Sequence, residues 1–210
     1  RQGQGAVTLA DVPKRTEAAE FTVAGLPLFR RLPVIWFGDG GAAKSMLALY
    51  AAATIAATGE PVLYADWEFS EDAHRDRLER FCGTDAMPRL VSYVHCAAPL
   101  CDDVDRLAEI IVERDCKYLV CDSVACACDG PPESAETAQK YFRALRYLKV
   151  GSLNIAHITK GGEENGAEQR PFGSNFWHHM ARSTWFMKRS DDSFNDETVD
   201  VALIQRKTNI

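Results

Sequence analysis

Residues 38–45 read Gly-Asp-Gly-Gly-Ala-Ala-Lys-Ser, which are the residue types and the spacing of a phosphate-binding loop. Backbone N–H groups in a glycine-rich turn can point together at phosphate oxygens, and a helix that follows adds the positive end of its dipole. Lys44 can reach the β- and γ-phosphates, and the Ser45 hydroxyl suits Mg²⁺. We therefore predict that a nucleoside triphosphate is bound by Gly38, Asp39, Gly40, Gly41, Ala42, Ala43, Lys44, Ser45 and Met46.

The residue before the lysine departs from the usual pattern, because this position is normally glycine and here is Ala43. A methyl group is tolerable if the backbone already has helical dihedrals, since only a positive φ demands glycine. We expect Ala43 to be helical and the loop to be a working variant. Two alternatives remain: a loop that binds nucleotide without hydrolysing it, and a chance glycine-rich turn before a helix.

Carboxylates follow two further apolar runs. Asp122 ends the run 118–122, and a buried strand that delivers a carboxylate at its carboxyl end is the Walker B arrangement. Asp66 and Glu68 close the run that starts at Val62. We predict that Asp122 holds Mg²⁺ next to Ser45. In a parallel sheet, His157 at the end of a later run would lie at the same edge.

Along most of the chain, short apolar runs typical of strands alternate with segments whose apolar residues recur at helical spacing. Strands are expected at 34–37, 62–66, 90–95, 118–122 and 153–159, and two closing strands at 183–187 and 198–205. Helices are expected at 46–58, 71–81, 102–115, 134–150 and 176–182. This order, with the phosphate-binding loop after the first strand, predicts an α/β P-loop core with a mostly parallel central sheet flanked by helices, and antiparallel strands near the C-terminus.

The chain has 210 residues, of which 46% are hydrophobic, and this suits one globular domain. We predict a lead-in or linker at 1–20 and an ATPase domain at 21–210. The segment 21–33 either wraps the first strand or contacts a neighbouring subunit, or else lies on the surface. A start at Arg1 rather than Met is compatible with a domain excised from a longer protein. No apolar run approaches the roughly 20 residues of a membrane span, and no signal peptide is present, so a cytoplasmic protein without a membrane partner is expected.

The net charge and the cysteine pattern bear on two further functions, nucleic-acid binding and zinc binding. The formal net charge of −6 excludes attraction of the whole molecule to nucleic acid, so any such contact needs a local basic patch. Seven cysteines are present, and four of them cluster between 116 and 128. A zinc site is one interpretation, but no C-x-x-C pair occurs and Cys121 lies inside an apolar run. We favour buried free thiols.

The ordered set of motifs resembles the RecA-like ATPases, and within them the hexameric plasmid-replication helicases of RepA type and their phage relatives. The resemblance covers about residues 21–210. The set consists of 38–45, Asp-Trp-Glu at 66–68, Tyr-Leu-Val-Cys-Asp-Ser at 118–123, His-Ile-Thr-Lys at 157–160, Arg-Pro-Phe-Gly-Ser at 170–174, and Arg182.

The resemblance implies a catalytic set of Glu68, Lys44, Arg182 and His157. Glu68 matches the glutamate that polarises the attacking water, with Asp66 a weaker substitute, and His157 matches the γ-phosphate sensor. Arg182 matches the arginine finger that a neighbouring subunit inserts, which implies a homo-oligomer, with a hexamer expected. The loop Lys160 to Ser174 matches the one that contacts single-stranded DNA.

Within that loop, Lys160 and Arg170 are the candidate contacts to the DNA backbone. Three glutamates in the same loop, Glu163, Glu164 and Glu168, oppose that role.

The function predicted from these residues is binding and hydrolysis of ATP with Mg²⁺ by a ring-forming DNA helicase or another motor of DNA replication or recombination. The alternative is a nucleotide-dependent assembly switch or regulator without helicase activity. A small-molecule kinase shares the phosphate-binding loop, but the sequence shows neither an acceptor site nor a lid.

Overall fold

The structure is a computed structural model, and it describes residues 6–14, 20–158, 175–190 and 198–208. Its centre is a seven-stranded sheet of order β5-β4-β6-β7-β3-β8-β9, in which every neighbouring pair is parallel except β8 and β9. The strands are β3 (Pro33–Gly38), β4 (Val62–Asp66), β5 (Val91–His95), β6 (Tyr118–Asp122), β7 (Gly151–His157), β8 (Ser183–Arg189) and β9 (Val201–Thr208). The predicted mostly parallel sheet with antiparallel strands near the C-terminus is confirmed.

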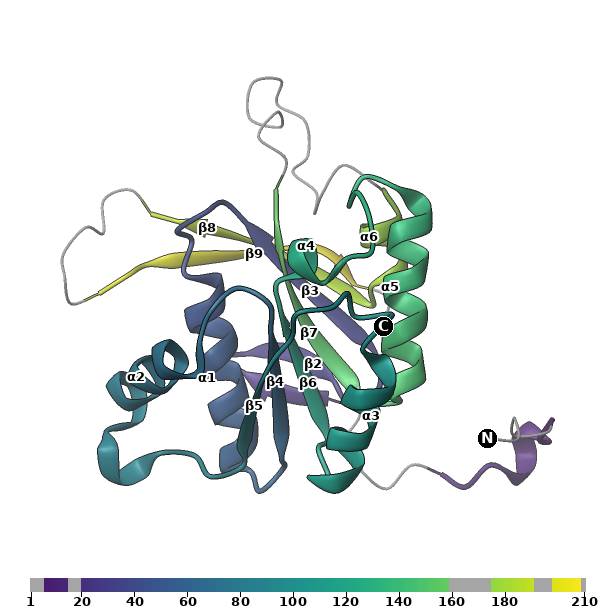
Figure 1. Cartoon of the computed structure of the whole chain (residues 1–210), viewed down its shortest axis with the longest axis horizontal. Helices are drawn as coiled ribbons and strands as arrows, with labels where there is room; N and C mark the ends of the chain where they lie inside the picture. The colour runs from purple at the N-terminus through teal and green to yellow at the C-terminus, as the bar shows by residue number, and fades with distance from the viewer. Residues whose placement is uncertain (1–5, 15–19, 159–174, 191–197, 209–210) are drawn as a thin grey trace.

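Helices cover both faces of the sheet (Figure 1). One face carries α1 (Lys44–Ala57) and α2 (Glu71–Cys82), and the other carries α3 (Val104–Glu113), α5 (Ala135–Leu148) and α6 (Asn175–Met180). The short helices are η1 (Leu9–Asp11), η2 (Thr84–Ala86) and α4 (Val124–Ala127). None of the helices among the described residues is long and apolar enough to span a bilayer.

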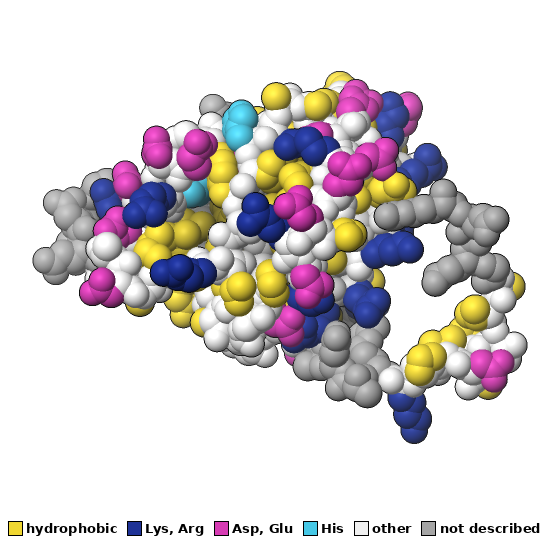
Figure 2. Space-filling model, turned by 60° about the horizontal axis from the view of Figure 1, so that its bottom comes forward, with side chains coloured by type: hydrophobic (Ala, Val, Ile, Leu, Met, Phe, Trp, Pro, Cys, Tyr) yellow, Lys and Arg dark blue, Asp and Glu magenta, His cyan; other side chains and the backbone are white. Residues whose placement is uncertain are grey.

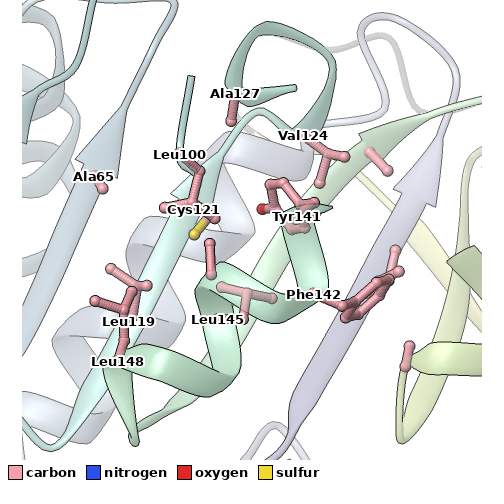
Figure 3. Packing of buried hydrophobic residues seen from close by; sticks show 14 of the residues in the cluster. Ala65, Leu100, Leu119, Cys121, Val124, Ala127, Tyr141, Phe142, Leu145 and Leu148 are labelled. Carbon is pink, nitrogen blue, oxygen red and sulfur yellow. The ribbon is translucent and has the colours of Figure 1, made fainter. Parts of the chain in front are cut away.

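The central strands are apolar because both of their faces are covered. Every residue of β4 and β6 is buried, as expected for parallel strands packed between two helical layers. On one side, α5 packs Tyr141, Phe142 and Leu145 against the sheet (Figure 3). These buried layers fix the strands, and the strands in turn fix the residues at their carboxyl ends.

The segment before β3 is a hairpin rather than an irregular surface segment. β1 (Glu20–Val23) and β2 (Leu26–Phe29) pair antiparallel, and the turn Ala24-Gly25 has φ values of 49° and 79°. Positive φ at both turn residues is typical of tight hairpins. Phe21, Val23 and Leu28 of the hairpin are buried in the core beneath α1. The surface interpretation is therefore wrong for these residues, because their apolar faces complete the core.

A close backbone approach locks this hairpin to the sheet. A Cβ at Gly151, the first residue of β7, would meet the Phe29 carbonyl oxygen at 1.9 Å. The Gly151 N–H donates to the Arg30 carbonyl oxygen at 2.6 Å. Only glycine fits this contact, which the sequence reading missed.

Element boundaries differ slightly from those expected. α1 begins at Lys44 rather than Met46, so Lys44 and Ser45 lie in its first turn. The short α4 after β6 was not predicted, since four residues are too few to show a helical period. Ser134, expected as the first helical residue, is instead the N-cap of α5, and its side chain accepts from the Glu136 N–H at 3.2 Å.

Candidate nucleotide site

The sheet register brings the carboxyl ends of four neighbouring strands to one edge. Gly38 of β3 pairs with His157 of β7, and Asp66 of β4 pairs with Asp122 of β6. Since β6 and β7 are also neighbours, the phosphate-binding loop, both aspartates and the histidine share one rim of the sheet. Ligands of open α/β sheets bind outside this rim.

Lys44 lies at the centre of that rim. Its Nζ donates to the carbonyl oxygens of Gly38 at 3.0 Å and Asp39 at 2.6 Å, and the side chain is buried. Burial lowers the pKa of Lys44, while nearby carboxylates, Asp122 first among them, act in the opposite direction. The lysine is thus a charge held at the loop, in the place where a phosphate-binding loop presents it.

Two glycines of the loop are required for different reasons. Gly41 has a φ of 78°, which side-chain-bearing residues rarely adopt. Gly38 has no such dihedral, but a Cβ there would meet the Met187 carbonyl oxygen of β8 at 2.3 Å. Gly38 is therefore required because β3 and β8 pack closely here, and not because the loop must curl.

Ala43 contradicts the expectation of helical dihedrals. Its φ and ψ are 57° and 23°, the left-handed conformation, and it occupies the N-cap position of α1. Its carbonyl oxygen accepts from the Leu47 N–H at 2.9 Å, so the loop must turn sharply here to start the helix. A left-handed alanine costs about 1–2 kcal/mol. The glycine usual at this position is explained by that turn.

Asp122 has one carboxylate oxygen engaged and one without a partner. Oδ2 accepts from the Tyr64 hydroxyl at 2.7 Å, whereas the buried Oδ1 has no hydrogen-bond partner among the described residues. Burial raises the pKa of Asp122, and the Tyr64 hydrogen bond and the nearby Ser45 hydroxyl oppose that rise. A buried carboxylate oxygen beside a serine hydroxyl is a hard-oxygen donor set, and this set fits Mg²⁺.

The loop after β4 is organised by Asp66, which is fully buried. Its carboxylate accepts from the backbone N–H groups of Glu68 and Phe69, each at 3.0 Å. It also contacts His74 Nε2 at 2.8 Å and the Tyr93 hydroxyl at 3.3 Å. Because these groups occupy Asp66, the geometry favours Glu68 over Asp66 as the carboxylate that is available for chemistry.

Glu68 lies among three polar side chains at the rim. Its Oε1 accepts from the Ser123 hydroxyl, lies 3.8 Å from His157 Nε2, and lies 3.7 Å from Cys126 Sγ. His157 and the Ser123 hydrogen bond lower the pKa of Glu68 to about 2, although burial acts against them. Glu68 is therefore ionised at neutral pH and can accept a hydrogen bond from a water molecule.

A pocket of about 350 Å³ joins these parts. It is lined by Gly41, Ala43, Lys44, Ser45, Met46, Glu68, Phe69, Arg77, Ile155 and His157. The sequence reading missed Arg77. The Cζ atom of this α2 arginine lies 4.7 Å from the centroid of the Phe69 ring. Its buried Nη1 has no hydrogen-bond partner in the described part of the chain. The apolar period and the caps of α2 do not distinguish this basic residue from the others on the helix.

A second pocket of about 420 Å³ adjoins the first, and Ala43 and Met46 line both. Its other lining residues are apolar or aromatic: Leu47, Tyr50, Phe81, Val199 and Val201. The rings of Tyr50 and Phe81 meet edge to face, with centroids 6.2 Å apart. A polar pocket beside an apolar, aromatic one matches the two ends of a nucleotide.

Arg182 is not brought together with the other predicted site residues. Its backbone N–H donates to the carbonyl oxygen of Pro33, the first residue of β3, whereas the phosphate-binding loop follows Gly38, the last. Five residue steps of a strand span roughly 17 Å. Arg182 therefore lies at the amino ends of the parallel strands, whereas Lys44 lies at their carboxyl ends. Within one chain, Arg182 is out of reach of Lys44.

Lys160 to Ser174, the predicted DNA-contacting loop, lies outside the described residues. The seven cysteines are free thiols, and Cys96, Cys116 and Cys121 are buried. No group of three or more metal-ligating side chains of the kind that could hold an ion occurs within 6–14, 20–158, 175–190 and 198–208.

Comparisons with known proteins agree with this geometry. Residues 6–163 match the family model described as an AAA domain. A comparison with the curated proteins found no match. A solved KaiC-like protein from the hyperthermophilic archaeon Pyrococcus horikoshii is similar in structure, with a TM-score of 0.65 and 16% sequence identity over 93% of this chain and 89% of that chain. At this identity the likeness describes the fold, and 670 solved chains share it, so the fold alone selects no function.

Proposed function

This chain belongs to the AAA domain family and is a P-loop ATPase of RecA-like fold, and we propose that it is a ring-forming DNA motor, a helicase or a related motor of DNA replication or recombination. The ATPase domain in this proposal spans 21–210, with 1–20 as a linker. The protein works in the cytoplasm, where thiols such as its seven free cysteines stay reduced.

In the proposed mechanism each rim residue has one task. Lys44 binds the β- and γ-phosphate oxygens, and Ser45 and Asp122 would hold Mg²⁺, which when bound would neutralise charge on the phosphates. Glu68 orients the attacking water, because it is ionised and lies at the pocket wall. His157 contacts both Glu68 and the γ-phosphate, and so couples hydrolysis to the segment that follows it.

The two adjoining pockets orient the nucleotide. The triphosphate lies in the polar pocket, where Lys44 and Arg77 supply positive charge. The adenine base lies in the apolar pocket against Tyr50 and Phe81. Ala43 and Met46 line both pockets and are contacted by the sugar and the α-phosphate.

The observation that carries the proposal is the separation of Arg182 from the Lys44 of its own chain. As the arginine finger that the resemblance implies, Arg182 would act at the γ-phosphate of a neighbouring subunit's site, since its backbone is held far from the Lys44 of its own chain. A closed ring, expected to be a hexamer, lets every subunit both give and receive a finger.

DNA enters the proposal through the segment Lys160 to Ser174, with Lys160 and Arg170 at the phosphate backbone. A local contact is needed, because the net charge is −6 and acidic and basic side chains are interspersed over the face seen in Figure 2. ATP binding at one subunit interface would order the segment after His157, and ATP hydrolysis would release it.

The test is the ATPase rate with and without single-stranded DNA, measured for the wild type, Lys44→Ala and Arg182→Ala. We expect DNA to stimulate the wild type and both variants to lose hydrolysis. An equimolar mixture of the two variants should regain part of the rate, because some mixed interfaces pair an intact Lys44 with an intact Arg182. A rate in the assembled protein that DNA leaves unchanged would refute the motor.

One alternative has support of its own. The acidic net charge and the strained Ala43 favour an assembly switch that uses ATP to control oligomerisation. Slow turnover with ATP-dependent oligomers and no binding to single-stranded DNA in the same assay would select this function.

A further inference from the structure

Lys207 of β9 closes the C-terminal end of α6. Its Nζ donates to the carbonyl oxygens of His178 at 2.8 Å, His179 at 2.7 Å and Ala181 at 2.8 Å. An ammonium group has three N–H donors, so these three carbonyls match its donor capacity. A lysine on a solvated strand usually has water around its ammonium group. Three carbonyl contacts on one ammonium group therefore point to a specific structural role for Lys207.

That task follows from the weakness of α6. The helix has six residues, and a helix this short is unstable without tertiary contacts. The last carbonyls of a helix have no partner within it and carry partial negative charge, which a cation at this end offsets. Lys207 satisfies these carbonyls from β9, 26 to 29 residues away along the chain.

We call these three Lys207 contacts the clamp, and Arg182 directly follows Ala181, the last residue that the clamp binds. Its N–H is fixed to the Pro33 carbonyl oxygen at 2.8 Å, and the next residue, Ser183, donates from its hydroxyl to the Lys207 carbonyl oxygen at 3.1 Å. The Arg182 backbone is thus held between β3 and β9. Its Nε, by contrast, is buried and has no hydrogen-bond partner among the described residues.

The charges of the two residues add a cost that the clamp offsets. Burial lowers the pKa of Lys207, and the charge of Arg182 lowers it further, so the two cations lie near each other. Two like charges at one site are unfavourable unless dipoles such as these carbonyls stabilise one of them.

We propose that Lys207 is a positioning residue for Arg182: by clamping the end of α6 it holds Arg182 where the neighbouring subunit's triphosphate can be reached. The inference rests on the proposed function, in which Arg182 acts in trans. Lys207 itself need not touch the nucleotide.

The experiment compares Lys207→Met, which keeps the chain length but removes charge and donors, with Lys188→Met at an exposed position on β8. We expect kcat of Lys207→Met to fall by about tenfold or more with KM nearly unchanged, because an interaction made only in the transition state is lost. Binding of a fluorescent ATP analogue should stay as in the wild type. Lys188→Met should match the wild type in both.

Two further readouts separate positioning from general damage. Lys207→Met subunits mixed with Lys44→Ala subunits should regain activity, since their own Lys44 is intact and the partner supplies an ordered Arg182. The double variant Lys207→Met/Arg182→Ala should be no slower than Arg182→Ala alone. If Lys207→Met does not fold, Lys207→Gln, which keeps N–H donors without the charge, is measured in the same way.

The outcomes are distinguishable. If Arg182→Ala keeps the wild-type kcat, the arginine finger and with it this inference fail. If Arg182→Ala is inactive while Lys207→Met behaves as Lys188→Met, the finger stands and the clamp is refuted. A Lys207 defect that mixing does not relieve, or that adds to the Arg182 defect, also overturns the clamp.

Discussion

Ala43 has a left-handed backbone at a position where the pattern of these loops has glycine. The methyl group does not prevent the turn, because the N-cap residue is fixed by the strand before it and the helix after it. The price is local strain, which glycine would not have. The same loop still places Lys44 and Ser45 in the first turn of α1.

We predict that Ala43→Gly raises the free energy of unfolding by up to about 1 kcal/mol, since relief of the strain exceeds the extra entropy of glycine in the unfolded chain. For a chain of this size the thermal midpoint should rise by roughly 2–4 °C. Calorimetry of Ala43→Gly beside Ala57→Gly measures this. Ala57, the exposed last residue of α1, should lose stability on the same change. Equal losses in both variants would mean that Ala43 is not left-handed.

At the scale of elements, the loop between β4 and α2 decides where Glu68, the carboxylate proposed to orient the attacking water, lies. A strand end alone would leave Glu68 on a flexible turn. Instead Asp66 binds two backbone N–H groups of that turn and reaches His74 on α2 and Tyr93 on β5. The buried carboxylate therefore ties the turn to both of its neighbouring elements.

We predict that Asp66→Asn destabilises the protein by about 3 kcal/mol, because the amide turns one acceptor into a donor that faces existing donors. The turn should loosen and kcat should fall by at least about tenfold, since Glu68 loses its position. Urea unfolding and ATPase kinetics test this. The control is Asp72→Asn, an exposed residue in the first turn of α2 that should change stability by less than about 1 kcal/mol. Matching effects of the two changes would contradict the role assigned to Asp66.

At the scale of the whole molecule, the two halves of the proposed site lie at opposite edges of one sheet. Lys44 is beyond the end of β3, and Arg182 is fixed to its start. A rigid sheet cannot bring them together, so the proposed role of Arg182 as an arginine finger needs a second copy of the chain. In that proposal each subunit gives Arg182 to one neighbour and receives it from another.

We predict that the ATPase rate per subunit falls when the protein is diluted, because interfaces dissociate and each Lys44 loses its partner's Arg182. The rate should follow the oligomer fraction measured by light scattering at the same concentrations. A rate per subunit that stays constant where only monomers are detected would show that the site is complete within one chain.

The motif residues could be found from the sequence because their chemistry is local in the chain. A glycine-rich turn after an apolar run, and a carboxylate at the end of one, can be recognised without knowing any long-range contact. The side chains that contact these motif residues could not be found in this way. Tyr64, Arg77 and Ser123 come from different elements, and only the sheet register and helix packing bring them to Asp122 and Glu68.

The sequence by itself determined the phosphate-binding loop, the order of the central strands and the longer helices, and the parallel sheet, since hydrophobic period and turn chemistry are properties of neighbouring residues. Only the tertiary structure decided that Ala43 is left-handed, that residues 20–29 form a buried hairpin, and that Lys207 meets the end of α6. Each of these depends on groups that are distant in the chain and are brought into contact by packing, and no local pattern encodes such contacts.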